Sequence, residues 1–497
     1  MRNPSTEQIL KDEECFEIIR KKLTKDSMED FSLITYEVIP IDEVNGFMGQ
    51  YFTLKATVAS PRSPLETKNI NFFTKVPPPM SSPQYDFIQQ YGTFKKEVAL
   101  YTTVFPEVLV DGLDKRYVPE CFLGLEDDVI VLEDMAHSGY EMTDKFEPFD
   151  FEHCKILMKT LARFHAKSLI FEELYQKSLH DEFSHCMQET LWPLKGGRAK
   201  AMFDAAVKGI VSLIDLMPRL NEAQKKAFSA KVTELCVDHA NKLLPSMKHK
   251  NVLCHGDLWA NNILFKYDND GKPLECCLID FQLARYNPPA HDILCFLQFT
   301  TTRELREKHG DELFRIYHDS MARALAEAGL DITTVFPWSD FAASIEDLRV
   351  MCITHGVLNI PIMLLEPGAA SKYFSHEPEL LENILYVDRT PLICKQVEDV
   401  PRYKDRMMDA LLELHDHVAV LNEFSNKLQA TRESRKLVLH DGRKERPEAY
   451  FYRILHRIRS VGEGATQQQS GGVVLPSSSS ARLVLQTRIE LHQHENL

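Results

Sequence analysis

The chain has two kinds of hydrophobic pattern: short apolar runs of strand length, and longer stretches with helical periodicity. The short runs dominate the first third of the chain. The runs Tyr51–Val58 and Ile70–Val76 have the length and composition of β-strands, and three prolines end the second run. Val129–Met135 is another apolar strand, which runs into acidic residues, whereas Phe94–Tyr101 has helical character. This pattern predicts a small, strand-rich N-terminal lobe over residues 30–132.

Helical periodicity dominates the rest of the chain. Leu191–Leu244 and Glu304–Phe424 carry apolar residues at helical spacing. We therefore expect a large, mainly helical C-terminal lobe over residues 133–430 and a helical extension over residues 1–29. His165 lies on an apolar helix face, where a lone histidine is expected to be a structural residue. Together these elements predict an α+β protein with two lobes.

A short hairpin over residues 255–281 interrupts the helical pattern. This stretch reads H-G-D-L-W-A-N-N-I-L-F-K-Y-D-N-D-G-K-P-L-E-C-C-L-I-D-F. Asp268–Gly271 has the composition of a hairpin turn, so the strands on either side should return the chain to its starting point. We expect the hairpin to bring Asp280 beside Asp257 and Asn262.

Asp257, Asn262 and Asp280 are residue types that phosphoryl transfer requires. A carboxylate at Asp257 can orient and deprotonate an attacking hydroxyl, and Mg²⁺ prefers a few hard oxygen ligands from the protein. The sequence therefore predicts Asp257 as the catalytic residue and Asn262 and Asp280 as metal ligands. The alternative, a hairpin with solvated aspartates, does not account for the agreement between the H-x-D-x4-N pattern and the later strand-Asp.

The same stretch resembles the catalytic and metal-binding loops of the protein-kinase-like superfamily, in the small-molecule branch with aminoglycoside phosphotransferases and choline kinases. Within that branch, H-G-D-L-W-x-N-N, I-D-F-Q and the P-P-A-H-D that follows are similar to the ecdysteroid kinase-like (CHK-like) family of insects. The resemblance runs from about residue 40 to about residue 425. It implies a two-lobed protein-kinase-like fold that uses ATP and Mg²⁺.

A nucleotide kinase of this fold needs a cation on the phosphates and an anion that holds the cation in place. Lys75 ends a strand-like run and Glu97 lies on the following helix, so we expect these two residues to form the pair. Either residue alone could be solvated, and the catalytic stretch favours the functional interpretation. Lys95 and Lys96 are weaker candidates, because lysines on a helix mostly face water.

Further nucleotide contacts follow from order along the chain. Asn45–Tyr51 precedes a strand, and its glycines, Gly46 and Gly49, are candidates for a loop that covers the phosphates; a plain hairpin turn is the alternative. The resemblance places the interlobe hinge near Glu133 and Met135, whose backbone groups would bind adenine. No G-x-x-x-x-G-K-S/T motif occurs, which excludes a P-loop enzyme.

The segment after Asp280 indicates the kind of acceptor. Gln282 replaces the glycine of D-F-G, and Gly256 replaces the arginine of H-R-D. Only a short segment leads from Asp280 to Asp292, which leaves no room for a peptide-docking platform. We therefore expect a small-molecule hydroxyl acceptor and no protein substrate. Asp292 is expected to anchor the catalytic loop or to cap the helix that follows it.

Composition and charge limit the partners and the cellular location that we expect for the protein. The net charge of −15 argues against a nucleic-acid partner. Eleven scattered cysteines form neither a disulfide framework nor a zinc pattern, and with a polar N-terminus they favour a reducing, cytoplasmic location. No apolar run reaches 18 residues, so no membrane span is expected. Residues 431–497 are low in complexity and basic on balance, and we expect this tail to be disordered.

Two classes of function follow. In the first, the chain is an ATP-dependent kinase whose acceptor, by resemblance, is an ecdysteroid or a related steroid or xenobiotic alcohol. A choline- or aminoglycoside-type kinase is the alternative within this class. In the second class, the chain is a non-catalytic pseudokinase that binds a ligand. The second class is disfavoured because Asp257, Asn262 and Asp280 are all present.

Overall fold

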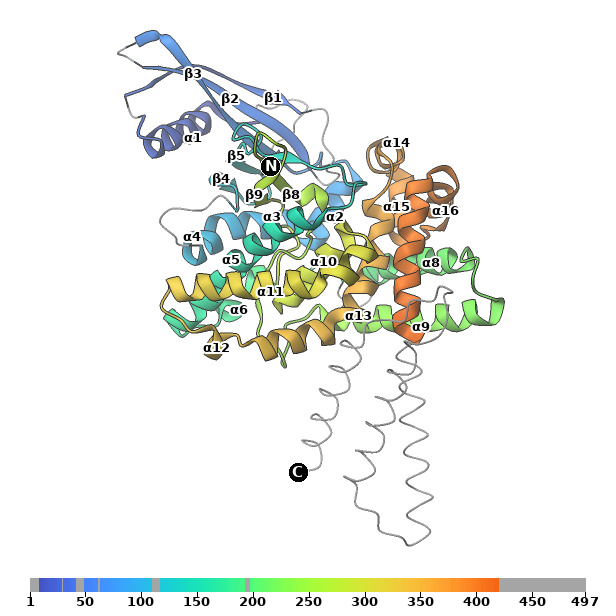
Figure 1. The fold of residues 1–497 in the computed structure, drawn as a ribbon. Coiled ribbons are helices and arrows are strands. Elements are labelled where there is room, and N and C mark those ends of the chain that lie inside the picture. Colours follow the sequence, from blue (N-terminus) through green and yellow to red (C-terminus); the bar gives the residue numbers. More distant parts are fainter. Residues whose placement is uncertain are drawn as a thin grey trace, which may run out of the picture. The chain divides into compact units, whose positions relative to one another are not determined.

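The computed structural model describes residues 9–28, 30–41, 49–60, 63–109, 117–192, 197–376 and 378–419. Gly46 and the tail over residues 431–497 lie outside the described residues. The described part is α+β, with an antiparallel sheet near the N-terminus and mainly helices after it (Figure 1). All the elements labelled in Figure 1 belong to one compact unit, which ends at Leu414.

The N-terminal sheet has five antiparallel strands in the order β1-β2-β3-β5-β4 (Figure 1). The strands are β1 Ser32–Pro40, β2 Gln50–Ser60, β3 Ser63–Val76, β4 Cys121–Leu125 and β5 Val129–Glu133. The three predicted strands are confirmed as β2, β3 and β5, although β5 ends two residues before Met135.

Alternate residues of the sheet form the core of this lobe, because successive side chains of a strand point to opposite faces. Helix α1 (Asp12–Lys25) packs on the buried face with one side of its surface. The shared cluster contains Cys15, Ile18, Ile19, Leu54, Ala56, Val58, Ile70 and Phe72. The helix near the N-terminus therefore belongs to the same core as the sheet.

A run of short helices connects β3 to β4. They are α2 Pro83–Tyr91, α3 Thr93–Ala99, the π-helical turn η1 Leu100–Val104 and α4 Phe105–Val108. Gly92, between α2 and α3, has φ at +62°, a conformation that glycine adopts without strain. The helix predicted from Phe94 is confirmed as α3, which carries Glu97 and continues into η1.

Helices build the C-terminal part. They are α5 Phe151–Tyr175, α6 Leu179–Glu182, α7 Ser184–Met187, α8 Gly197–Asp215, α9 Glu222–Lys242, α10 Pro289–Thr300, α11 Arg303–Glu327, α12 Ile332–Val335, α13 Trp338–Met363, α14 Pro367–Ser371, the π-helical turn η3 Lys372–His376, α15 Pro378–Tyr386 and α16 Thr390–Asp399. Residues 401–419 are also helical. Every residue of α10 is buried, so α10 is a central helix of this lobe.

Two small sheets interrupt the helices. The elements are β6 Glu141–Met142, β7 Val252–Cys254, the short 3₁₀ helix η2 Ala260–Asn262, β8 Ile263–Tyr267, β9 Pro273–Leu278 and β10 Arg285–Asn287. β8 and β9 form the predicted hairpin with β6 beside β8, and β7 pairs with β10. The hairpin turn is confirmed: the amide of Gly271 donates to the Asp268 carbonyl oxygen at 3.1 Å.

A membrane span requires a long and strongly apolar helix. None of the described helices, taken singly, is long and apolar enough. Only α13 joined to residues 367–374 meets the requirement, and that pair is bent by 80°.

Candidate active site

The predicted catalytic stretch, residues 255–281, begins where β7 ends. His255, Gly256 and Asp257 follow Cys254 as a loop, which we call the catalytic loop. The side-chain amide of Asn262 donates to the Asp257 carbonyl oxygen at 2.8 Å and to Asp257 Oδ2 at 3.0 Å. These bonds fix the two residues relative to each other and leave Oδ1 of each side chain as an acceptor.

His255 joins this loop to the strand that leads to Asp280. His255 Nε2 donates to the Ile279 carbonyl oxygen at 2.9 Å, and the Ile279 amide donates to the Asn262 carbonyl oxygen at 3.1 Å. Asp280 then has φ at +65°, in the left-handed region that aspartate tolerates better than most residues. The hairpin therefore brings Asp280 to the loop of Asp257 and Asn262.

Lys75 connects the N-terminal sheet to this region. Its Nζ donates to Glu97 Oε2 at 2.7 Å and to Asp280 Oδ1 at 3.3 Å, although Asp280 lies 205 residues further along the chain. Lys75 and Glu97 are almost fully buried, whereas 24% of the Asp280 side chain is exposed. Burial alone would lower the pKa of Lys75, but the carboxylates of Asp280 and Glu97 raise it above its usual value.

The prediction that Lys96 faces water is wrong. Lys96 is buried, and its Nζ donates to the carbonyl oxygens of Gln188 at 2.5 Å and Ala284 at 3.0 Å. Burial lowers the pKa of Lys96 to about 8. The pattern of α3 alone cannot reveal these partners, because both belong to distant segments. Lys96 thus ties α3 to the segment after Asp280, whereas Lys95 is exposed.

Gly256 allows the segment after Asp280 to approach the catalytic loop. Its φ is +81°, and a Cβ there would lie 2.2 Å from the Leu283 carbonyl oxygen. Arg285 is buried beside it, with Nη2 3.5 Å from the Gly256 carbonyl oxygen and Nη1 3.2 Å from Glu189 Oε2. Arg285 is not among the predicted site residues, and its place shortly after Asp280 is the available sequence signal for it.

Asp292 anchors the catalytic loop, as predicted, but it is not the N-cap of the following helix. Helix α10 begins at Pro289, and Pro288 is its N-cap. Proline suits the first turn of a helix, so α10 starts earlier than the N-cap prediction assumed. The Asp292 carboxylate instead accepts hydrogen bonds from the backbone amides of His255 at 2.6 Å and Gly256 at 2.9 Å.

His165 braces Asp292 from helix α5. Its Nε2 lies 3.1 Å from Asp292 Oδ2, and its Nδ1 lies 2.9 Å from the Tyr317 hydroxyl. Burial alone would raise the pKa of Asp292, but the hydrogen bond with His165 helps to hold it well below its usual range. These contacts are those of a structural histidine, as the apolar face of its helix predicts.

Replacing Asp292 with Asn should lower the free energy of unfolding by about 3 kcal/mol. The reason is that an amide offers one acceptor oxygen where the carboxylate accepts from two backbone amides and contacts His165. Urea denaturation of the purified variant measures the change. Asp311→Asn, an exposed position on α11, is the matched control. Equal midpoints for both variants would show that Asp292 does not anchor the loop.

The backbone groups near the expected hinge are partly used within the chain. The Glu133 amide donates to the Glu120 carbonyl oxygen at 2.8 Å. The Met135 carbonyl oxygen accepts from the amides of Ser138 at 3.1 Å and Tyr140 at 3.0 Å. No hydrogen bond among the described residues uses the Met135 amide, which is therefore the candidate donor to a nucleotide base.

Gly49 lies against the strand pair that carries Lys75. A Cβ at Gly49 would lie 3.3 Å from the Tyr51 hydroxyl and 3.3 Å from the Val76 carbonyl oxygen. Tyr51 is the partner of Lys75 in the register of β2 and β3, and burial raises the pKa of Tyr51 to about 12. Tyr51 was predicted only as the end of a loop and the start of a strand, because its place beside Lys75 depends on strand register.

The charges of the site favour a bound cation. Burial raises the pKa of Asp257 to about 7, and the Asp280 carboxylate adds to the rise. Asn262 Oδ1 and the Asp280 carboxylate are hard oxygen donors of the kind that Mg²⁺ prefers. Because the Asn262 Nδ2 is engaged by Asp257, its oxygen is the atom left for a metal. These residues fit Mg²⁺ shared with the phosphate oxygens of a nucleotide.

Comparison with known sequences gives a family match. The sequence model of the ecdysteroid kinase-like family matches residues 43–330, more than half of the chain. A curated relative, the 4-hydroxytryptamine kinase of Psilocybe cyanescens, is 32% identical over 106 residues. That match covers 19% of this chain and 29% of the length of the relative.

Solved structures overlay on the chain only loosely. A choline/ethanolamine kinase family protein from Mesorhizobium loti has 13% sequence identity and a TM-score of 0.31, and the match covers 80% of this chain and 99% of that chain. A microcompartment-associated aminopropanol kinase has 12% identity and a TM-score of 0.34, with 79% and 99% covered.

Proposed function

The chain belongs to the ecdysteroid kinase-like family, and on this basis we propose that it is an ATP-dependent kinase that transfers the γ-phosphate to a hydroxyl of a small organic molecule. One observation carries the proposal: Lys75 Nζ binds both Glu97 and Asp280. These two bonds bring together strand β3 of the N-terminal sheet, helix α3 and the segment that follows the β8–β9 hairpin.

In this proposal Asp257 acts on the acceptor. Its Oδ2 is held by the amide of Asn262, so its Oδ1 accepts a hydrogen bond from the attacking hydroxyl and takes the proton. The hydroxyl oxygen forms a bond to the γ-phosphorus while the bond from that phosphorus to the β,γ-bridging oxygen breaks. ADP leaves, and the phosphorylated acceptor is the second product.

The remaining residues hold the donor. Lys75, kept in place by the Glu97 carboxylate, contacts the phosphates, and the Met135 amide contacts the base. Gly49 has no side chain to crowd the Tyr51 hydroxyl and the Val76 carbonyl oxygen, which suits a loop that lies close over phosphates. Asn262 and Asp280 would hold Mg²⁺, which when bound neutralises charge on the phosphate oxygens.

For the acceptor we propose an ecdysteroid or a related steroid or xenobiotic alcohol, on the strength of the family. A choline- or aminoglycoside-type acceptor would need carboxylates or an aromatic cage for its cation. The curated relative adds a hydroxylated tryptamine to the acceptors worth testing. A pseudokinase is the less favoured alternative, because the base and both metal ligands are present together.

The cysteines support a cytoplasmic location. None of the eleven, all of which lie in the described part of the chain, forms a disulfide, and most are buried. Proteins of oxidising compartments usually pair their cysteines, so this pattern is typical of a reducing compartment.

Purified protein with Mg·ATP should release ADP in the presence of one class of acceptor. The panel contains ecdysteroids, plant steroids and glycosides, choline, an aminoglycoside and 4-hydroxytryptamine, and ADP release is measured with each compound. Asp257→Asn is the negative control, because it removes the proposed base and leaves the fold in place.

Each outcome decides between the alternatives. Turnover by the wild type alone and with one compound class would support the kinase and identify its acceptor. ATP binding without turnover would exclude the tested acceptors. Absence of both ATP binding and turnover would favour the pseudokinase.

A further inference from the structure

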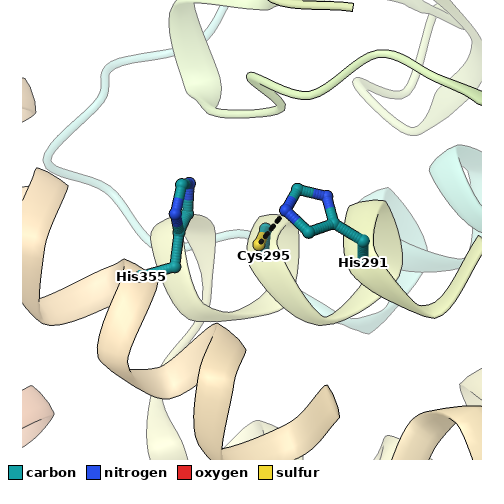
Figure 2. A group of neighbouring side chains, drawn as sticks. All are labelled: His291, Cys295 and His355. Atoms are coloured by element: carbon teal, nitrogen blue, oxygen red, sulfur yellow. Dashed lines mark hydrogen bonds between the residues drawn. The ribbon is translucent and has the colours of Figure 1, made fainter. Parts of the chain in front are cut away.

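A second cluster of metal-binding residue types lies between α10 and α13. Figure 2 shows His291 and Cys295 on α10 and His355 on α13. One ligand atom of each residue lies within 4.8 Å of the others. All three residues are at least 96% buried. His291 and Cys295 are four residues apart, which places them on one face of their helix.

The Nδ1 atoms of both histidines face residues outside the cluster. His291 Nδ1 lies 3.6 Å from Asp292 Oδ1, which is too long for a hydrogen bond. His355 Nδ1 lies 2.5 Å from His239 Nε2, within hydrogen-bond distance. Metal-binding histidines usually have such a partner on the nitrogen that does not bind the metal. Nε2 of both rings is thereby left for a ligand.

The spacing of the ligand atoms suits a tetrahedral ion. With zinc–sulfur bonds of about 2.3 Å and zinc–nitrogen bonds of about 2.0–2.1 Å, neighbouring ligand atoms lie about 3.6 Å apart. The distance from His291 Nε2 to Cys295 Sγ is 3.8 Å. An ion could therefore bind these two atoms with only a small shift of either side chain.

Cys352 is the nearest candidate for a fourth ligand, although its Sγ is not among the atoms that all lie within 4.8 Å of one another. It lies one turn before His355 on α13, its Sγ is 3.9 Å from the His291 carbonyl oxygen, and it interacts with the Cys295 thiol, so it would have to shift toward the cluster to bind the ion. Two thiolates and two neutral imidazoles around Zn²⁺ carry no net charge. A neutral complex is what a fully buried position requires, because an unbalanced buried charge is costly.

We propose that this cluster, completed by Cys352, binds a zinc ion with a structural role. The H-x3-C pair of α10 and the C-x2-H pair of α13 supply two ligands each. The ion ties the two helices together beneath the catalytic loop. Because Asp292 follows His291 directly and anchors that loop, the ion also fixes the start of the helix that carries the anchor.

The test is the metal content of the full-length protein, produced without an affinity tag in zinc-supplemented medium and dialysed against a chelator. We expect one zinc per chain by elemental analysis, and its loss in Cys295→Ala. Cys154→Ala, which alters an equally buried cysteine on α5, is the matched control and should keep its zinc. His239→Phe should weaken zinc binding about 10- to 100-fold by removing the partner of His355.

A second measurement covers the case in which Cys295→Ala does not fold. Wild-type protein refolded with Co²⁺ should show the charge-transfer absorption of thiolate-bound cobalt and a higher thermal midpoint than protein refolded with a chelator. Wild-type protein without zinc, equal zinc in Cys295→Ala and wild type, or cobalt protein without thiolate absorption would each overturn the proposal. None of these readouts depends on kinase activity.

Discussion

Asp257→Asn should lower the turnover number about 10²- to 10⁴-fold and leave the affinity for ATP nearly unchanged. Asparagine has the shape of aspartate and can still accept the hydrogen bond from Asn262, so the loop should keep its conformation. It cannot take a proton from the acceptor hydroxyl. The loss should therefore fall on kcat, measured with the acceptor that the panel identifies.

The matched control for this variant is Asp270→Asn, which makes the same chemical change at an exposed position of the hairpin turn. Its turnover should equal that of the wild type. ATP binding measured by calorimetry separates a loss of chemistry from a loss of nucleotide. Near-normal turnover by Asp257→Asn would remove this residue from the mechanism.

Asp280→Asn should raise the Mg²⁺ concentration needed for half-maximal activity and lower turnover about 10²- to 10³-fold. The variant removes a charge that also faces Lys75 Nζ at 3.3 Å. Asparagine is a better choice here than alanine, because the φ of +65° at this position is tolerated by asparagine and strained for alanine. A titration of initial rates against Mg²⁺ measures both effects.

Asp127 offers a matched control for Asp280→Asn. It also has a positive φ, +56°, but it lies in the turn between β4 and β5. Asp127→Asn should therefore leave the Mg²⁺ dependence unaltered. If the two variants behave alike, Asp280 is not a metal ligand and the proposed site is wrong.

Much of the local structure could be predicted because it depends on short-range chemistry. The turn residues from Asp268 to Gly271 and the apolar runs beside them specify a hairpin wherever they occur. The hairpin then forces Asp280 toward Asn262, so those two positions follow from the chain itself. The pairing of Lys75 with Glu97 could be predicted only with the family resemblance, because neither residue has a distinctive neighbourhood.

The errors have a common physical cause. Helical periodicity shows which residues share a face, but it does not show what covers that face. Lys96 was expected in water and is buried against carbonyl oxygens of two distant segments. Of the two roles expected for Asp292, only the cap of its own helix is wrong, because its carboxylate reaches the amides of another loop.

The sequence by itself determined the strands, the central hairpin and the chemistry-bearing residues, because turn propensity, strand alternation and motif spacing act over a few residues. The tertiary structure alone decided which distant residues meet. Lys75 reaches Asp280 across 205 positions, and two helices separated in the chain by α11 and α12 bring His291 to His355. Such long-range contacts depend on how whole helices and strands pack together. That packing depends on all the buried surfaces of the protein and not on any one segment.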